Sequence, residues 1–260
     1  MQMQNYSIVY GPVPSWRLGR SLGIDIVSTE GKTCTFDCIY CQLGRTVHQT
    51  DQRNEFVSID LLQSELESVR GIPIDYITFS GIAEPTLALN LGQAIDLAKE
   101  MFAFPVAVLT NASLMSRQDV RRDLAHADVV VAKVDAPNEE LFRLINRPVN
   151  GISFENTIDG IREFRSGFSG TLALQMMFVD QNKASASQMA IIAEGIAPDE
   201  LQLNTPLRPC AVKALDESEM DLIKQAFARF GDKAVMVYDA AKPIVEPVNM
   251  AQTLRRRPQL

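Results

Sequence analysis

The sequence of 260 residues lacks the features that mark membrane, secreted and repeat proteins. It has no uninterrupted apolar run of about 18 residues, the length that a transmembrane helix requires. Residues 1–11 lack the basic and then apolar pattern of a signal peptide. No internal repeat, low-complexity run or Gly/Ser-rich linker is present. These absences predict a soluble, cytoplasmic protein that does not act at a membrane.

Positive charge is also scarce, because 25 Lys and Arg residues stand against 32 Asp and Glu residues and the net charge is −7. An acidic chain disfavours a broad nucleic-acid-binding surface, although a local basic patch is compatible with it. Hydrophobic residues make up 46% of the chain, which is enough for a sizeable core. The length fits one large domain or two small ones.

Short apolar runs alternate with amphipathic stretches along most of the chain. Near-continuous apolar runs are typical of parallel strands that are covered on both faces. Such runs occupy residues 21–27, 75–81, 105–111, 128–136, 171–180 and 200–204, and residues 234–240 are a candidate for a last strand. Amphipathic helical patterns lie at residues 58–71, 89–102, 116–126, 154–167 and 216–231. The first of these helices has Ser58 as its expected N-cap and Gly71 as its end.

This alternation predicts an α/β fold in which right-handed crossovers build a parallel sheet. A full eight-unit barrel typically needs about 250 residues. Six strand–helix units, the first helix starting only at Ser58, therefore predict a partial (β/α)6-type barrel of parallel strands with outer helices. We expect a single domain over residues 1–260, with an N-terminal lead-in at 1–20 and a C-terminal tail at 240–260. The basic end of the tail, residues 254–260, is expected to be loose.

Polar side chains gather where the predicted strands end. The carboxyl ends of parallel strands meet at one edge of the sheet, and ligands bind at this edge in such folds. We therefore expect one site built from Ser80 to Glu84, Thr110, Asn111, Lys133, Asp135, Gln175 and Asn204 to Arg208.

Three of the four cysteines stand in the segment CTFDCIYC, which follows the first predicted strand. In the cytoplasm, clustered cysteines are more often metal ligands or redox groups than disulfides. A structural zinc site needs four ligands, so His48 or Cys210 would complete it. A 4Fe–4S cluster also takes four ligands, and three cysteines would leave one iron open to a non-protein ligand. A zinc-stapled binding protein and an iron–sulfur enzyme both remain open at this point.

The spacing C-x3-C-x2-C, with Tyr40 before the last cysteine, resembles the motif of the radical S-adenosylmethionine (SAM) superfamily. Together with residues 10–27, Ser80 to Pro85 and LNTPLRP, it is similar to a branch related to the wybutosine-synthesis-type radical enzymes. This resemblance implies a 4Fe–4S cluster on Cys34, Cys38 and Cys41, with SAM chelating the open iron. It also implies an electron donor such as flavodoxin or ferredoxin. The reduced cluster would cleave SAM to a 5′-deoxyadenosyl radical, which abstracts hydrogen from a substrate.

The same resemblance implies roles for residues at the strand ends. Gly81 and Glu84 match a Gly-Gly-Glu-type motif that holds the amino end of SAM, although Ile82 and Ala83 depart from the small residues common there. The remaining cofactor-binding candidates are Tyr40, Thr110, Asn111, Lys133, Asp135 and Gln175. Because strand side chains alternate, Lys133 and Asp135 are expected to share a face, either as ligand contacts or as a structural ion pair.

Substrate contacts are predicted from arginines and one amide: Arg17, Arg20, Asn204 and Arg208. Arg208 is suited to a bidentate contact with a carboxylate or phosphate. A solvated loop is the alternative for Arg17 and Arg20. Cys210 is interpreted as a hydrogen donor, a second redox group or a small buried residue. The substrate class stays open between a small molecule, a peptide and RNA, so tRNA-modifying and glycyl-radical-activating enzymes are both compatible.

Overall fold

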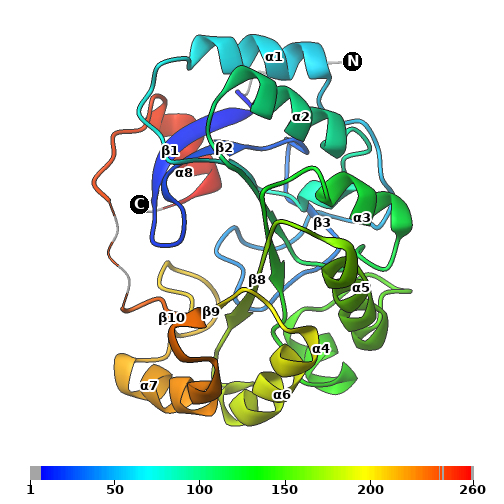
Figure 1. Cartoon of the computed structure of the whole chain (residues 1–260), viewed down its shortest axis with the longest axis vertical. Coiled ribbons are helices and arrows are strands. Elements are labelled where there is room, and N and C mark those ends of the chain that lie inside the picture. Colours follow the sequence, from blue (N-terminus) through cyan, green and yellow to red (C-terminus); the bar gives the residue numbers. More distant parts are fainter. Residues whose placement is uncertain (1–6, 240, 242, 259–260) are drawn as a thin grey trace.

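The computed structural model describes residues 7–239, 241 and 243–258, and its centre is one curled eight-stranded sheet (Figure 1). Neighbouring strands from β2 to β10 are parallel, whereas β1 pairs antiparallel with β2. Across the sheet the strands are β1 (Val9–Ser15), β2 (Gly19–Ile24), β5 (Tyr76–Phe79), β6 (Val106–Thr110), β7 (Val129–Lys133), β8 (Thr171–Met177), β9 (Glu200–Asn204) and β10 (Ala234–Met236). A separate short pair is formed by β3 (Thr33–Cys34) and β4 (His48–Gln49).

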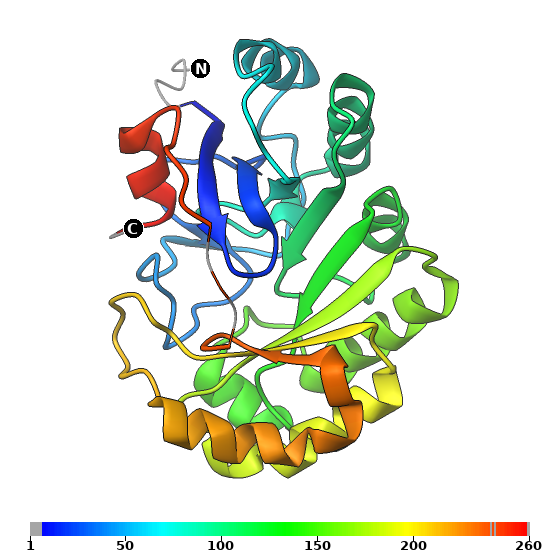
Figure 2. The same cartoon turned by 60° about the vertical axis from the view of Figure 1, so that its left-hand side comes forward.

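Helices surround the outer side of the curled sheet, as Figure 2 shows. They are α1 (Ile59–Ser68), α2 (Leu91–Met101), α3 (Gln118–Leu124), α4 (Glu139–Ile145), α5 (Phe154–Gly167), α6 (Ala186–Ile196), α7 (Glu217–Ala226) and α8 (Met250–Arg256). Three short 3-10 helices are η1 (Pro85–Leu87), η2 (Lys183–Ser185) and η3 (Ala228–Lys233). The predicted partial barrel of parallel strands with outer helices is confirmed.

The core lies between the sheet and these helices, for reasons visible in the sequence. The apolar strand β6 buries Val106, Ala107 and Val108 completely, as expected for a strand covered on both faces. Helix α1 buries one stripe, Leu62 and Leu66. The predicted N-cap of α1 is confirmed, because the Ser58 hydroxyl accepts a hydrogen bond from the Leu61 backbone N–H.

Several elements were not predicted from the sequence, among them β1, α6 and α4. Strand β1 lies inside the predicted lead-in, whose first six residues lie outside the described part of the chain. Its sequence VYGPVPS contains Pro12 and Pro14, which cannot donate ladder hydrogen bonds and are therefore confined to edge strands such as this one. Helix α6 was missed because its run AIIAEGI is apolar on most faces, with Ile191 exposed. Helix α4 is only two turns long.

The expectation of a loose C-terminal end is wrong for residues 254–258, while residues 259–260 of that prediction lie outside the described residues. Helix α8 packs against β1, so the last described helix lies beside the first strand (Figures 1 and 2). The Thr253 hydroxyl accepts a hydrogen bond from the Gly11 backbone N–H at 3.0 Å. The side chain of Arg256 is fully buried, which a solvated basic tail would not require. The C-terminal segment is therefore part of the folded domain.

Candidate functional site

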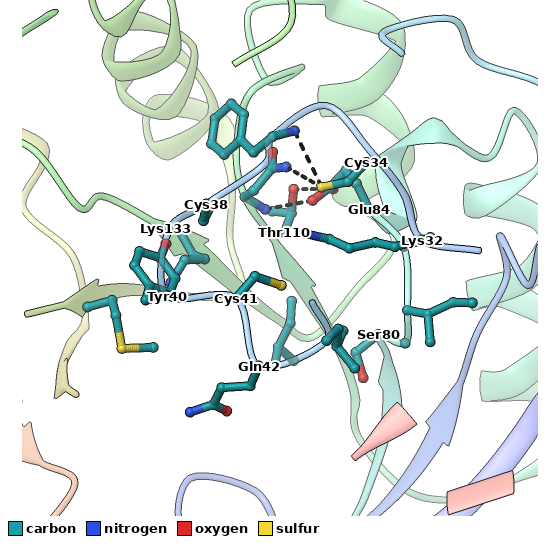
Figure 3. Close-up of a pocket in the computed structure, with 18 of the residues that line it drawn as sticks. Lys32, Cys34, Cys38, Tyr40, Cys41, Gln42, Ser80, Glu84, Thr110 and Lys133 are labelled. Atoms are coloured by element: carbon teal, nitrogen blue, oxygen red, sulfur yellow. Dashed lines mark hydrogen bonds between the residues drawn. The ribbon is translucent and has the colours of Figure 1, made fainter. Parts of the chain in front are cut away.

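A cavity of about 250 Å³ lies at the carboxyl ends of β5 to β8, beside the loop that carries the three cysteines (Figure 3). The predicted edge of the sheet is therefore hollow. Most predicted site residues line this cavity, namely Cys34, Cys38, Tyr40, Cys41, Gly81, Glu84, Thr110, Asn111, Lys133, Gln175 and Arg208.

The cysteine loop is held by hydrogen bonds to its sulfur atoms. Cys34 Sγ accepts from Asn111 Nδ2 at 3.4 Å, and Cys38 Sγ accepts from Asn146 Nδ2 at 3.5 Å. The Cys41 N–H donates to the Cys38 carbonyl at 3.1 Å, which turns the chain between them. Burial raises the pKa of Cys34 to about 12 and that of Cys38 to about 11. Both are protonated thiols in the metal-free chain, so binding of a metal would release protons.

Lys32 is the cation of this loop, and its side chain points toward Cys41 in Figure 3. Burial lowers the pKa of Lys32, but Cys41, Cys34 and Cys38 together outweigh burial, so the net pKa is raised. In the described part of the chain, no three His, Cys, Asp or Glu side chains are arranged closely enough to hold a metal ion in this conformation. The donor set itself, three thiols around one ammonium in a largely apolar cavity, fits an anionic iron–sulfur cluster.

The two residues considered as a fourth zinc ligand are placed differently. His48 is exposed on β4 and is not among the residues lining the cavity. Cys210 lines a neighbouring cavity together with Cys38 and Cys41, and its thiol donates to the Val212 carbonyl at 3.2 Å. Cys210 therefore borders the cysteine loop without joining the main cavity.

Glu84 is 3% exposed and ties two strand ends together. Its Oε1 accepts from Thr110 Oγ1 at 2.6 Å and from Thr86 Oγ1 at 2.7 Å and N at 3.1 Å. Its Oε2 accepts one bond, from the Asn111 N–H at 2.7 Å. Burial raises the pKa of Glu84, and these hydrogen bonds oppose that rise. Oε1 is fully used within the protein, so the predicted contact with an ammonium group is left to Oε2.

Replacing Glu84 with Gln is expected to lower the free energy of unfolding by about 1–3 kcal/mol, because one buried donor loses its acceptor. The Gln oxygen can replace Oε1, but its amide then faces the Asn111 N–H, donor against donor. Urea unfolding measures the change. Glu67→Gln on the exposed side of α1 is the matched control. Equal stability of the two variants would contradict the anchoring role of Glu84.

Asp135 lies behind Tyr40, outside the lining of the main cavity. It is 3% exposed and accepts hydrogen bonds from the Tyr40 hydroxyl, from Asn146 Nδ2 at 2.9 Å and from the Met177 N–H at 2.9 Å. Lys133 Nζ lies 3.4 Å from Asp135 Oδ1 and 5.0 Å from the centre of the Tyr40 ring. The structural ion pair is thus the arrangement observed, and Asp135 positions Tyr40. Asn146, which shares this network, carried no signal in the sequence.

Gly81 is required by packing against a residue that the sequence did not single out. A Cβ at this position would lie 2.3 Å from Asp25 Cγ, far closer than atoms can approach. The Ile82 N–H, next in the chain, donates to Asp25 Oδ2 at 3.4 Å. Gly81 also lines the cavity, so its backbone faces any ligand there.

The predicted substrate contacts separate into two groups. Arg17, Asn204 and Arg208 line a second cavity of about 230 Å³, and Arg208 also lines the first. Arg20 lies instead at the amino ends of β2 and β5, where it pairs with Asp75 at 2.7 Å, and is not brought to either cavity. Arg257, from the supposedly loose tail, lines the second cavity and was missed.

A search of the described residues for a helix both long and apolar enough to cross a membrane finds none.

Comparison with known proteins gives a match of residues 31–190 to the model of the family described as "Radical SAM superfamily".

Two curated relatives extend this match over most of the chain. The UPF0026 protein MJ1312 of Methanocaldococcus jannaschii is 37% identical over 233 residues, which are 87% of this chain and 72% of that protein. The UPF0026 protein slr1464 of Synechocystis sp. is 39% identical over 205 residues, 78% of this chain and 77% of that protein. A GTPase Obg of Brachyspira hyodysenteriae is 38% identical over 227 residues, but these are only 33% of its length.

Solved structures share the fold at low sequence identity. SuiB of Streptococcus suis, bound to the precursor peptide SuiA, has a TM-score of 0.64 at 12% identity; the match covers 84% of this chain but 49% of SuiB. The chain thus spans about half of SuiB. TYW1 (wybutosine synthesis), with a lysine–pyruvate adduct bound, has a TM-score of 0.61 at 14% identity, with 81% and 73% covered. The protein anSMEcpe with bound AdoMet has a TM-score of 0.63 at 16% identity, with 84% and 64% covered.

Proposed function

The chain belongs to the radical SAM superfamily and to the UPF0026 family within it, and on this premise we propose that it is an enzyme that cleaves SAM reductively at a 4Fe–4S cluster held by Cys34, Cys38 and Cys41. The observation that carries the proposal is the meeting of all three cysteines at one cavity at the carboxyl ends of the strands. When bound and reduced, the cluster supplies the electron that converts SAM to methionine and a 5′-deoxyadenosyl radical, which removes a hydrogen atom from the substrate.

The protein's own residues bind, orient and shield these groups. Lys32, buried among the thiols, balances the negative charge that thiolates bring. Tyr40 lines the cavity in a fixed orientation, because Asp135 and Asn146 form hydrogen bonds with its hydroxyl. Glu84 Oε2 is the carboxylate oxygen with capacity left for the ammonium of SAM.

The other side of the cavity is suited to the nucleoside part of SAM. Apolar side chains of Ile82, Leu109, Val131 and Met177 exclude water from it. Lys133 and Gln175 offer polar contacts among these apolar side chains. In the structure Lys133 Nζ donates to Gln175 Oε1 at 3.4 Å. Thr110 and Asn111 are committed to Glu84 and Cys34, so they act as positioning residues.

A zinc-stapled binding protein is the second candidate, and one observation favours it. Cys210 lies beside Cys38 and Cys41, where it would supply a fourth thiolate to a closed tetrahedral site. The tRNA-modifying and glycyl-radical-activating activities, a flavodoxin or ferredoxin electron donor and the cytoplasmic location remain predictions.

Metal analysis after anaerobic reconstitution separates the two candidates. We expect about four irons per chain, with a brown colour, and release of 5′-deoxyadenosine when SAM and dithionite are added. Omitting dithionite is the control and is expected to prevent the release. A colourless protein with about one zinc per chain and no nucleoside product would overturn the proposal and favour the binding protein.

A further inference from the structure

Three arginines surround the second cavity, which we call the arginine pocket: Arg17, Arg208 and Arg257. Arg17 follows β1, Arg208 follows β9, and Arg257 follows α8, so three distant segments bring positive charge to one place. Within the described residues none of the three forms an ion pair, whereas the neighbouring Arg256 is paired with Asp25. The cavity of about 230 Å³ adjoins the cavity of the cysteines, because Arg208 and Gln42 line both.

The charges near the arginine pocket do not neutralise it. Glu200 is the carboxylate that raises the pKa of Arg17, but among the described residues it forms no ion pair with any of the three arginines, and its Oε1 accepts from Gln202 Nε2 at 2.8 Å. One negative charge thus stands against three positive ones. Burial, followed by repulsion from Arg257, lowers the pKa of Arg17 and of Arg208 to about 10. Arg17 and Arg208 therefore remain charged at neutral pH, and Arg257 is charged as well because guanidinium groups stay protonated in proteins.

Hydrogen-bond donors in the arginine pocket are left without acceptors. Arg17 Nε and Arg208 Nη1 are buried and have no hydrogen-bond partner among the described residues. The bonds that their guanidinium groups do make are long: Arg17 Nη1 lies 3.4 Å from Gln202 Oε1, and Arg257 Nη1 lies 3.4 Å from the Pro14 carbonyl. A buried donor without a partner is unfavourable, and an anionic ligand would satisfy it with a charge-assisted bond.

We infer that the arginine pocket binds the phosphate group of a small phosphorylated substrate, whose remaining part extends past Arg208 and Gln42 toward the cysteines. Three cations match a phosphate dianion, with its three acceptor oxygens, better than a single carboxylate. The arginines are partly buried around a small cavity rather than spread over a surface, and the chain carries a net charge of −7; both favour a small molecule over RNA. The identification of this ligand as the substrate rests on the proposed function. The binding of phosphate to the arginine pocket does not depend on that function.

Isothermal titration of the anaerobically purified full chain with inorganic phosphate tests this inference. We expect phosphate to bind and acetate to bind at least tenfold more weakly. Arg257→Gln and Arg17→Gln are each expected to weaken phosphate binding about tenfold or more, as loss of a hydrogen bond to a charged group does. Arg257→Lys keeps the positive charge but loses the planar guanidinium group. Its affinity for phosphate should lie between that of Arg257→Gln and that of the wild type.

Arg162→Gln is the control with the same loss of charge, because Arg162 pairs with Asp159 on the exposed side of α5. Thermal unfolding of each variant shows whether it is folded. The inference is overturned if the wild type binds no phosphate, if acetate binds equally well, or if folded Arg257→Gln and Arg17→Gln bind like Arg162→Gln. A short single-stranded RNA that binds more tightly than phosphate, and loses binding in the same variants, would overturn the small-substrate part. The titration needs neither SAM nor reductant, so failure of the proposed radical chemistry is detected separately.

Discussion

Cys38→Ala is expected to abolish the release of 5′-deoxyadenosine, down to the level measured without protein. The side chain of Cys38 lines the cavity that holds the other two clustered cysteines, and alanine removes one of three thiolates from the cluster. We do not expect the loss to come from unfolding, because the hydrogen bond that Cys38 Sγ accepts from Asn146 Nδ2 is a long one, 3.5 Å. Nucleoside release, iron content and thermal unfolding of the anaerobically reconstituted variant measure these effects.

Cys210→Ala is the matched control, and it also separates the two candidate functions. Cys210 borders the same loop as Cys38 and Cys41, but a cluster held by three cysteines does not need it. We therefore expect this variant to keep its iron and its nucleoside release. If Cys210→Ala loses its metal as completely as Cys38→Ala does, four thiolates hold the metal, and the closed zinc site is favoured.

The location of the site was predictable because it follows from strand direction alone. Parallel strands end at one edge, so polar residues at the ends of different strands meet there whatever the details of packing. Cys34, Glu84, Lys133 and Arg208 come from four separate segments and line one cavity, as the sequence predicted. The spacing of the cysteines led to the proposed chemistry, since three thiolates would leave one iron of a 4Fe–4S cluster open.

The partners of each site residue were not predictable, because they depend on contacts across the sheet. Asp135 was expected to lie near Lys133, and the two form the ion pair, but nothing in the sequence showed that Asp135 also accepts from the Tyr40 hydroxyl. Glu84 was assigned to the amino end of SAM, and the hydrogen bonds that it accepts from Thr86 and Thr110 show only in three dimensions.

The roles of the C-terminal residues were missed for a related reason. A run of three arginines near a chain end has the composition of a solvated tail. The middle arginine, Arg256, forms a buried ion pair with Asp25, which lies far away in the sequence on the segment after β2. The same contact holds the next residue, Arg257, at the arginine pocket. This buried ion pair, together with the bond between Gly11 and Thr253, therefore connects the C-terminal helix to the proposed substrate side of the molecule.

Arg256→Met is expected to lower the free energy of unfolding by about 3–5 kcal/mol, because it leaves a buried carboxylate without its partner. Arg256 and Asp25 have side chains 0% and 2% exposed, joined at 2.8 Å. Arg256 also donates to the Ser7 carbonyl at 2.8 Å and to Ser28 Oγ at 3.0 Å. Urea unfolding measures the loss. Arg229→Met, which breaks an exposed pair with Glu194, is the control and should cost at most about 1 kcal/mol.

The loss in Arg256→Met is further expected to depend on pH. Burial already raises the pKa of Asp25 while Arg256 lowers it, so removing Arg256 raises that pKa further. A carboxyl group whose pKa is raised in the folded state favours folding when protonated, and this contribution is lost as the pH rises through the folded pKa. The variant should therefore be less stable, relative to wild type, at pH 8 than at pH 5. Adding Asp25→Asn should remove this dependence and restore part of the stability. A loss no larger than that of Arg229→Met, unchanged between pH 5 and pH 8, would show that the pair does not hold α8 in place.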